Sequence, residues 1–357
     1  MSTTYAQNSP NVTTFDCPIA EDIWFSNVIM YFITLILGLT GNTLVLVIVV
    51  KRKRKRTEND VFIANLAVSD LALLLFFLPI KLYSYLTCEP RVPFAAFCTF
   101  VYPMSVLTFS TSIFTMTAMS VHRCRRIVSP FLAPIRRVYI CAWLVVIWVF
   151  SVVLIIPLSV LTKLNPENGL CKEHFPSMKT KKVYTAVLFA VQCVIPLFII
   201  LGAYLLIFRD LNKSNVHRAS VNKKGRITTN CSRSENKQVI STIAAIVFLF
   251  VLCTFPTQVA WMAADFGDKD AVAAAMIIFR FSDILAVFHS CLNPIVYGTL
   301  TRYFRRGFYR YLCCFYKRCN KRPFSQTSSF SRQQPRQNYF FTRATSKKKD
   351  QLIKINL

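Results

Sequence analysis

The sequence predicts an all-α membrane protein, a bundle of seven transmembrane helices, and three observations lead to this fold class. Hydrophobic residues make up 54% of the 357 residues, more than a typical soluble protein carries. Apolar runs of roughly 20 residues or more, enough to cross a hydrocarbon core about 30 Å thick, recur along the chain. The basic residues, which give a net charge of +27, lie between or after these runs.

Seven such runs follow one another along the chain. Five contain no charged residue, namely 23–50, 92–121, 138–162, 183–208 and 238–264. Residues 61–80 are interrupted only by Asp70, and residues 271–300 only by Arg280 and Asp283. Each run predicts one helix across the membrane, and because their number is odd the two termini lie on opposite sides.

Lysine and arginine predict the orientation, since short cytoplasmic loops carry an excess of them. Residues 51–56 read KRKRKR, and 123–137, 209–237 and the tail after 300 are also basic, whereas 1–22 contain no Lys or Arg. We therefore expect 1–22 to be extracellular, 23–300 to form the membrane domain and 316–357 to be a disordered cytoplasmic tail. The outer segment holds a glycosylation sequon at Asn11. Because the basic bias follows the topology, nucleic acid is not an expected partner.

Polar residues inside the predicted spans are candidate functional groups, because each is costly in lipid unless it is paired. The set is Asn42, Asp70, Ser112, Ser290 and Asn293. It could bind a small cation or water around the carboxylate, or it could be a hydrogen-bonded cluster that holds helices together. Prolines inside five spans predict kinks and room for a cavity: Pro79, Pro157, Pro196, Pro256 and Pro294.

Several short motifs carry a resemblance to a known family. They are GN at 41–42, NLAVSD at 65–70, Trp148, Pro196 with Tyr204 eight residues later, and NPIVY at 293–297. Together with the seven spans, these residues resemble the rhodopsin-like (class A) G-protein-coupled receptors over residues 23–315. The resemblance implies a plasma-membrane receptor, not an enzyme, that activates heterotrimeric G proteins and is then bound by receptor kinases and arrestin.

The resemblance extends to the end of the membrane domain. TRYFRRGFYRYLCC at 301–314 looks like the amphipathic eighth helix of the family, which we expect over 301–315. In it Phe304 and Phe308 would face membrane lipid, and palmitoylated Cys313 and Cys314 would serve as anchors. The clustered hydroxyls of the tail at 325–331, SQTSSFS, are expected phosphorylation sites for arrestin recruitment.

A disulfide and a sodium site are also implied by the family. Cys98 stands where the family has its third-helix cysteine, so Cys171 is its expected partner, and a Cys17–Cys88 pair is a second hypothesis. Asn42, Asp70, Ser112 and Asn293 match positions around the family's allosteric sodium ion. His289 departs from the asparagine usual there, which puts a sodium ion in question.

The cytoplasmic switch of the family matches a further set of positions, with one departure. The matching residues are Arg123, Pro130, Phe131, Tyr204, Asn293, Pro294 and Tyr297, with Ile113, Pro196 and Phe250 as the hydrophobic trio that repacks on activation. The family's DRY reads HRC at 122–124 in this chain. His122 cannot supply a permanent negative charge, so we expect a weaker resting restraint on Arg123. In the sixth span CTFP at 253–256 replaces the family's CWxP.

The ligand is predicted mainly by charge. Asp283 lies in the outer half of the last span, and further acids stand in the outer segments, so a cationic ligand is expected. The candidate ligand-binding residues are Asp283, Arg280, Lys81, Tyr85, Tyr102, Ser105, Gln192 and Gln258. Ser105 stands where aminergic receptors have aspartate, and Val287 where opsins have a retinal lysine. An extracellular peptide, basic or amidated, fits this set; a nucleotide or other small molecule is the alternative, and a transporter a remote one.

Overall fold

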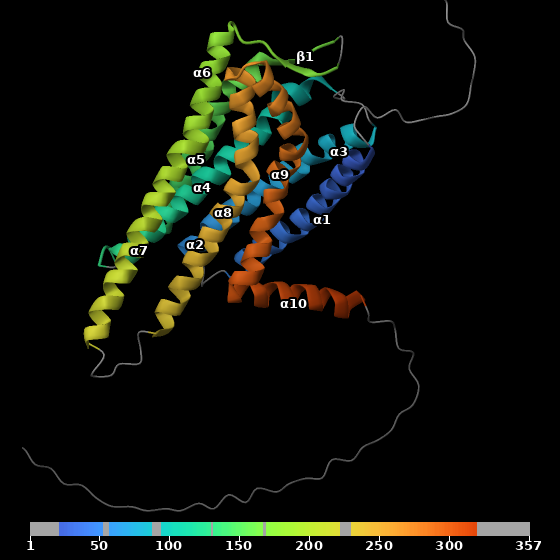
Figure 1. Ribbon diagram of the computed structural model, residues 1–357. Coiled ribbons are helices and arrows are strands. Elements are labelled where there is room, and N and C mark those ends of the chain that lie inside the picture. The colour runs from blue at the N-terminus through green and yellow to red at the C-terminus, as the bar shows by residue number, and fades with distance from the viewer. Residues whose placement is uncertain are drawn as a thin grey trace, which may run out of the picture. The chain divides into compact units, whose positions relative to one another are not determined.

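The computed structural model describes residues 21–52, 57–87, 94–129, 131–166, 169–221 and 230–319, and in these ranges nearly every residue is helical (Figure 1). Six helical segments are each long and apolar enough to cross a membrane, and the number becomes seven when the two parts of the last one are taken as a single span. These two parts, Lys269–Phe279 and Phe281–Leu300, meet at 41°. The predicted all-α, seven-span architecture is confirmed.

The helices follow in chain order, with three short π-helical segments inside the spans. They are α1 (Glu21–Lys51), α2 (Glu58–Ala72), η2 (Leu73–Phe77), α3 (Leu78–Leu86), η3 (Phe97–Val101), α4 (Tyr102–Val128), α5 (Arg137–Leu161), α6 (Met178–Phe189), η4 (Ala190–Val194), α7 (Ile195–Val221), α8 (Asn230–Phe266), α9 (Lys269–Leu300) and α10 (Arg302–Cys319). A compact unit runs to Cys313, and the last turns of α10 belong to a second unit.

Two helices are longer than their apolar runs predict. The linker expected over 209–237 is helical in its outer parts, since α7 continues to Val221 and α8 begins at Asn230. The apolar runs mark only the membrane-embedded part of a helix. Residues 209–221 contain no proline or glycine, so nothing in them ends the helix where the hydrophobic run stops.

Three of the prolines follow a π-helical segment at a constant distance. Pro79, Pro103 and Pro196 each lie two residues after the last residue of η2, η3 and η4. At the end of each segment the backbone N–H bonds to the carbonyl five residues earlier, as Leu78 does to Leu73. A π turn re-routes the hydrogen bonds that the proline ring disrupts, so these three helices continue across the membrane.

Buried polar contacts join neighbouring helices. The Asn42 side chain of α1 donates to the Ser290 carbonyl of α9 at 2.9 Å, and Gly41 lets the two backbones approach. A Cβ on Gly41 would lie 2.7 Å from the Pro294 Cβ. Asn65 of α2 accepts from the Trp148 indole of α5 at 2.9 Å and donates to Thr115 of α4 at 2.8 Å. Because lipid is as apolar as the helix surfaces, such contacts help to choose helix partners.

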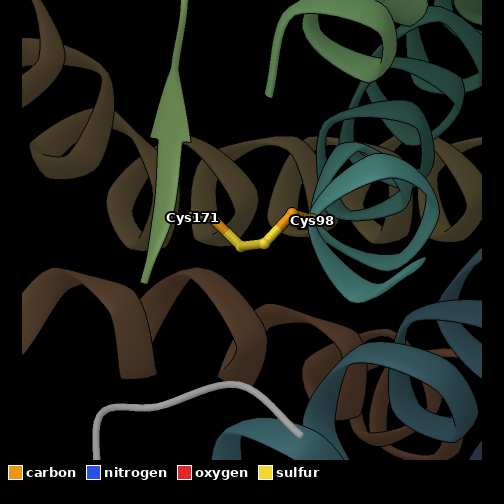
Figure 2. Close-up of a disulfide and its surroundings, with 2 residues drawn as sticks. All are labelled: Cys98 and Cys171. Atoms are coloured by element: carbon orange, nitrogen blue, oxygen red, sulfur yellow. A yellow bond between two sulfur atoms is a disulfide. The ribbon is translucent and has the colours of Figure 1, made fainter. Parts of the chain in front are cut away.

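A β-hairpin that the sequence did not predict lies at one end of the bundle. Strands β1 (Thr162–Leu164) and β2 (Cys171–Glu173) are antiparallel, and Leu164 pairs with Cys171. Cys171 forms a disulfide with Cys98, with the Cα atoms 5.3 Å apart, so the predicted pair is confirmed (Figure 2). The disulfide ties β2 to the start of the third span.

The eighth helix is confirmed as α10, but its expected orientation is wrong. Phe304 does not face lipid: it is only 2% exposed and stacks on Tyr297 with ring centroids 5.3 Å apart. Phe308 packs partly buried against the same core. The Tyr303 hydroxyl donates to the Ile48 carbonyl of α1 at 3.2 Å. The aromatic face of α10 therefore packs on α1 and α9, and among its described side chains Tyr309 and Leu312 are the exposed large hydrophobic ones.

Candidate functional site

A cavity of about 210 Å³ lies near the hairpin end of the bundle. Its walls come from α1, η2, α3, α4, α5, α6, η4, α8 and α9, with Glu173 contributed by β2. Six of the predicted ligand-binding residues line it: Lys81, Tyr102, Ser105, Gln192, Gln258 and Asp283. Such a concave site, mostly apolar with a few convergent polar groups, is typical of a ligand pocket.

The other two predicted residues are placed differently. Tyr85 is not part of the cavity wall and packs on Tyr31, with ring centroids 5.2 Å apart, and Tyr31 is itself a lining residue. Arg280 lies on α9, but its side chain is outside the described part of the structure. Six of the eight predicted residues therefore line one cavity, and Tyr85 packs behind Tyr31 of the cavity wall.

Asp283 is paired with a lysine from another helix. Its carboxylate lies 3.6 Å from the Lys81 Nζ, and the side chains are 40% and 30% exposed, respectively. Both residues line the cavity. A pair this exposed contributes little to stability, about 0–1 kcal/mol, because water competes for both charges. A cation arriving in the cavity can therefore compete with Lys81 for Asp283 at small cost.

A second acidic group was missed by sequence reasoning. Glu173 lines the cavity, and its carboxylate lies 3.1 Å from the Lys181 Nζ. Lys181 also contacts Asp265 at 3.2 Å, and Asp265 accepts from the Thr185 hydroxyl at 2.5 Å. The signal that could have found Glu173 is its place two residues after Cys171, since a disulfide-held strand brings its neighbours over the pocket.

The polar cluster in the middle of the bundle is built around Asp70. One carboxylate oxygen accepts from the Asn293 amide at 2.8 Å, while the other has no hydrogen-bond partner and lies 3.9 Å from the His289 Nε2. The Ser112 hydroxyl is engaged with Ser69 at 3.2 Å instead. Hard cations prefer a shell of oxygen ligands. An imidazole nitrogen beside the free carboxylate oxygen does not suit such a shell, so these residues do not fit a sodium ion.

The predicted hydrophobic trio lies beside the cavity, since Phe250 contacts Phe109 and His289, which both line it. Ile113 and Phe250 are buried in one core cluster, and Phe250 stacks on Phe109 with centroids 5.1 Å apart. Pro196 is also buried. Thr254, in place of the family's tryptophan, donates to the Phe250 carbonyl at 2.7 Å and lines the cavity.

No ion pair of Arg123 occurs within the described ranges, and its Nε has no hydrogen-bond partner there. The Tyr297 hydroxyl, buried in the same half of the bundle, likewise has no partner in the described part. Tyr204 is half-buried and packs against the main core cluster. His122 is 4% exposed and packs on Phe62, with ring centroids 5.7 Å apart. The described contacts contain no acid that holds Arg123.

Several predicted residues lie outside the described part of the chain. Asn11, Cys17, Cys88, Pro130 and the tail serines lie outside the described residues, and so do the side chains of Cys313 and Cys314. Phe131 is described and is fully exposed.

Comparisons with known proteins agree with this architecture. Residues 41–297 match the family described as "7 transmembrane receptor (rhodopsin family)". The chain is similar to neuropeptide FF receptor 1 of Rattus norvegicus, with 32% identity over 300 residues, which cover 78% of this chain and 68% of the relative. It is also similar to galanin receptor type 1 of Rattus norvegicus, with 28% identity over 307 residues, which cover 84% of this chain and 85% of the relative. The match spans the first helix motif through NPIVY, and the chain belongs to the rhodopsin family of seven-transmembrane G-protein-coupled receptors.

Proposed function

We propose that this receptor binds an extracellular peptide with a basic group or an amidated end and passes the signal to a heterotrimeric G protein. The amino terminus would be outside and the basic tail in the cytoplasm of the plasma membrane. The observation that carries the proposal is the charge of the cavity. Two carboxylates, Asp283 and Glu173, line it from α9 and from β2, and the lysines that face them are partly exposed.

The shape of the site supports a peptide over a compact small molecule. The cavity is lined by helix residues such as Phe109 and Gln192 and by Glu173 of the hairpin itself, so a ligand can contact both the helices and the hairpin. The relatives are named as receptors for neuropeptide FF and galanin. A linear peptide with a cationic or amide end could place that end near Asp283 while its remainder leaves past the hairpin.

A nucleotide is less well accommodated. Polyphosphates need several unpaired cations, and among the described residues that line the cavity only Lys81 and His289 are basic. Lys81 faces Asp283, and His289 is 4% exposed beside Asp70. An anionic ligand would meet the two carboxylates directly, which costs free energy through like-charge repulsion.

At the cytoplasmic end, Arg123 would contact the G protein after activation, with Tyr204 and Tyr297 as its new partners. Phe131 is fully exposed at the loop that follows α4, which supports its insertion into an apolar pocket of the G protein. Receptor kinases and arrestin would act on the tail, a glycan would be attached at Asn11, and palmitoyl chains at Cys313 and Cys314 would enter the membrane lipid.

The test is a screen of cells that express the receptor, with calcium and cAMP as readouts. We expect responses to basic or amidated peptides, and a lower potency when the basic group or the terminal amide of an active peptide is neutralised or replaced by a free acid. A receptor that answers nucleotides and ignores every such peptide would contradict the proposal.

A further inference from the structure

A second cavity, also of about 210 Å³, lies at the carboxyl end of α4. It is lined by His122, Arg125, Arg126, Ser129, Leu132, Ala133, Pro134 and Ile135. Phe109, the last α4 residue on the wall of the ligand pocket, is thirteen residues before His122. At 1.5 Å per residue the two cavities are therefore separated by about 20 Å along α4.

His122 is the buried polar group of this second cavity. It is 4% exposed, and neither ring nitrogen has a hydrogen-bond partner in the described part of the structure. A neutral imidazole always carries one N–H, so a buried donor is left without an acceptor. Leaving such a group unsatisfied costs about 1–3 kcal/mol, which makes the cavity a place where an acceptor is favoured.

The charges around the cavity favour an anion as that acceptor. Arg125 donates to the Ala133 carbonyl at 3.3 Å, which holds the loop after α4 against the helix. Arg126 is exposed. Neither arginine is part of an ion pair among the described residues. The positive charge of both is therefore not compensated there.

The acids of the neighbouring helix do not neutralise this site. Glu58 at the start of α2 acts on His122 through its charge but is not part of the cavity wall. Asp60 is already engaged, because it accepts from the Arg52 guanidinium at 3.0 Å and from the Thr57 backbone at 2.7 Å. The cavity wall itself contains no acid.

We propose that this cavity binds a phosphate-bearing anion, with the His122 N–H and the Arg125 and Arg126 guanidinium groups as donors. A phosphate has several acceptor oxygens and up to two negative charges, so it can satisfy the imidazole and both arginines at once, which a monovalent anion such as chloride cannot. The anion is either free phosphate or the phosphate of a lipid head group. It is distinct from the proposed peptide ligand, whose pocket is the other cavity.

The experiment uses the full-length receptor, labelled with ¹⁵N-histidine and reconstituted in phosphatidylcholine nanodiscs. The chain has only four histidines, and loss of a signal in His122→Gln identifies that of His122. Inorganic phosphate is titrated into one sample, and a second sample contains phosphatidylinositol 4-phosphate. We expect the His122 imidazole signal to shift saturably with phosphate if the site takes the free ion, or only with the phosphoinositide if it takes a head group.

Two arginine variants complete the test. Arg126→Gln removes a donor from the cavity and should raise the apparent Kd roughly tenfold or more, since a hydrogen bond to a charged group contributes about that much. Arg306→Gln removes an exposed arginine of α10, outside the cavity, and should leave the Kd unchanged. Unshifted His174 and His289 signals show that each variant is folded.

The proposal is overturned if neither anion moves the His122 signal, or if Arg306→Gln weakens binding as much as Arg126→Gln. The latter result would indicate attraction to a generally basic surface. A signal that moves only when a G protein is added would also overturn it, because the acceptor would then be a protein group.

Discussion

The charge of one residue, Asp283, decides most of the ligand proposal. The structure gives Asp283 a partner from another helix, Lys81 of α3 at 3.6 Å, a contact between residues about 200 positions apart that no local pattern could predict. The side chain of Arg280, one helical turn away from Asp283, lies outside the described residues. The residue itself was predictable, because a carboxylate in the outer half of a span is costly unless a cation meets it.

Asp283→Asn should weaken the potency of a basic peptide agonist by roughly 30-fold or more. The reason is that losing one partner of a desolvated ligand ion pair costs about 2–5 kcal/mol. Lys81→Gln should leave potency unchanged or raise it, since it removes the competing cation. Asp270→Asn, which removes an exposed carboxylate outside the cavity, is the matched control. Dose–response curves at equal surface expression measure all three. Normal potency in Asp283→Asn would make Asp283 a structural partner of Lys81 only.

A single histidine should also set the resting activity. Arg123 has no acid partner among the described residues, so we expect raised signalling without ligand. His122→Asp would place a carboxylate beside it, and an ion pair that favours the inactive state by about 1 kcal/mol lowers the active population roughly fivefold. His122→Asn, of similar size and no charge, should not do so. Ligand-independent cAMP or calcium levels measure the effect. Equal signalling from His122→Asp and His122→Asn would refute the hypothesis that Arg123 is only weakly restrained.

His289 should make the receptor insensitive to sodium. Its Nε2 lies 3.9 Å from the carboxylate oxygen of Asp70 that has no hydrogen-bond partner, so a cation there would lack an oxygen shell. Agonist affinity in membranes should therefore respond equally to sodium chloride and choline chloride. In His289→Asn an amide oxygen replaces the ring, and sodium should then reduce agonist affinity more than choline does. A sodium-specific effect in the unmodified receptor would show that the imidazole does not prevent binding.

Contacts between helices depend on small residues. The sequence identified Gly41 as part of a motif but not as a contact between two helices. Gly41 belongs to the GN motif, and the structure explains the glycine: a Cβ there would lie 2.7 Å from Pro294 on α9. Gly202 on α7 has nothing within 4 Å of the same atom. Both glycines lie inside helices, but only Gly41 is needed for a close approach to a neighbouring helix.

Gly41→Ala and Gly202→Ala should change thermal stability in opposite directions. Overpacking against Pro294 should cost about 1–3 kcal/mol in Gly41→Ala. Gly202→Ala meets no neighbour and should stabilise its helix by about 0.5–1 kcal/mol. Melting of the purified receptor in detergent measures both. If Gly41→Ala and Gly202→Ala have equal melting temperatures, α1 and α9 can move apart enough to accept the methyl group at position 41.

The helices themselves were largely predictable, whereas their irregularities were not. Hydrocarbon thickness sets the length of an apolar run, so each predicted span matches a helical segment. A π turn adds one residue to a helical turn without changing composition, so the segments before Pro79, Pro103 and Pro196 leave no periodic signal. The three-residue strands of the hairpin are too short to show alternation. Phe304 was misplaced because an amphipathic pattern identifies an apolar face but not whether lipid or protein covers it.

For the whole receptor, the disulfide connects the hairpin to the ligand pocket. It joins Cys171, on the strand that carries Glu173, to Cys98 at the start of the third span, across a sequence separation of 73 residues. Lys181 then links Glu173 to Asp265 on α8 at 3.1 and 3.2 Å. The strand is therefore held over the pocket from two sides, by a covalent bond to one helix and by ion pairs to others.

Removing both cysteines of the disulfide should reduce peptide potency but leave ligand-independent signalling unchanged. For a random chain the lost cross-link would cost about 4 kcal/mol, but α4 and α5 remain in the membrane when the loop opens, so this value is an upper limit. Cys98→Ser/Cys171→Ser should lower the melting temperature and the peptide potency, because β2 no longer presents Glu173 to the cavity. Ligand-independent signalling per receptor at the surface should stay the same, since Arg123 is remote from the hairpin.

Cys141→Ser, which changes an exposed free cysteine of α5, is the control and should alter neither the melting temperature nor the peptide potency. If the double variant keeps full potency at equal surface expression, the hairpin is not part of the peptide site, and the carboxylate that matters is Asp283 alone.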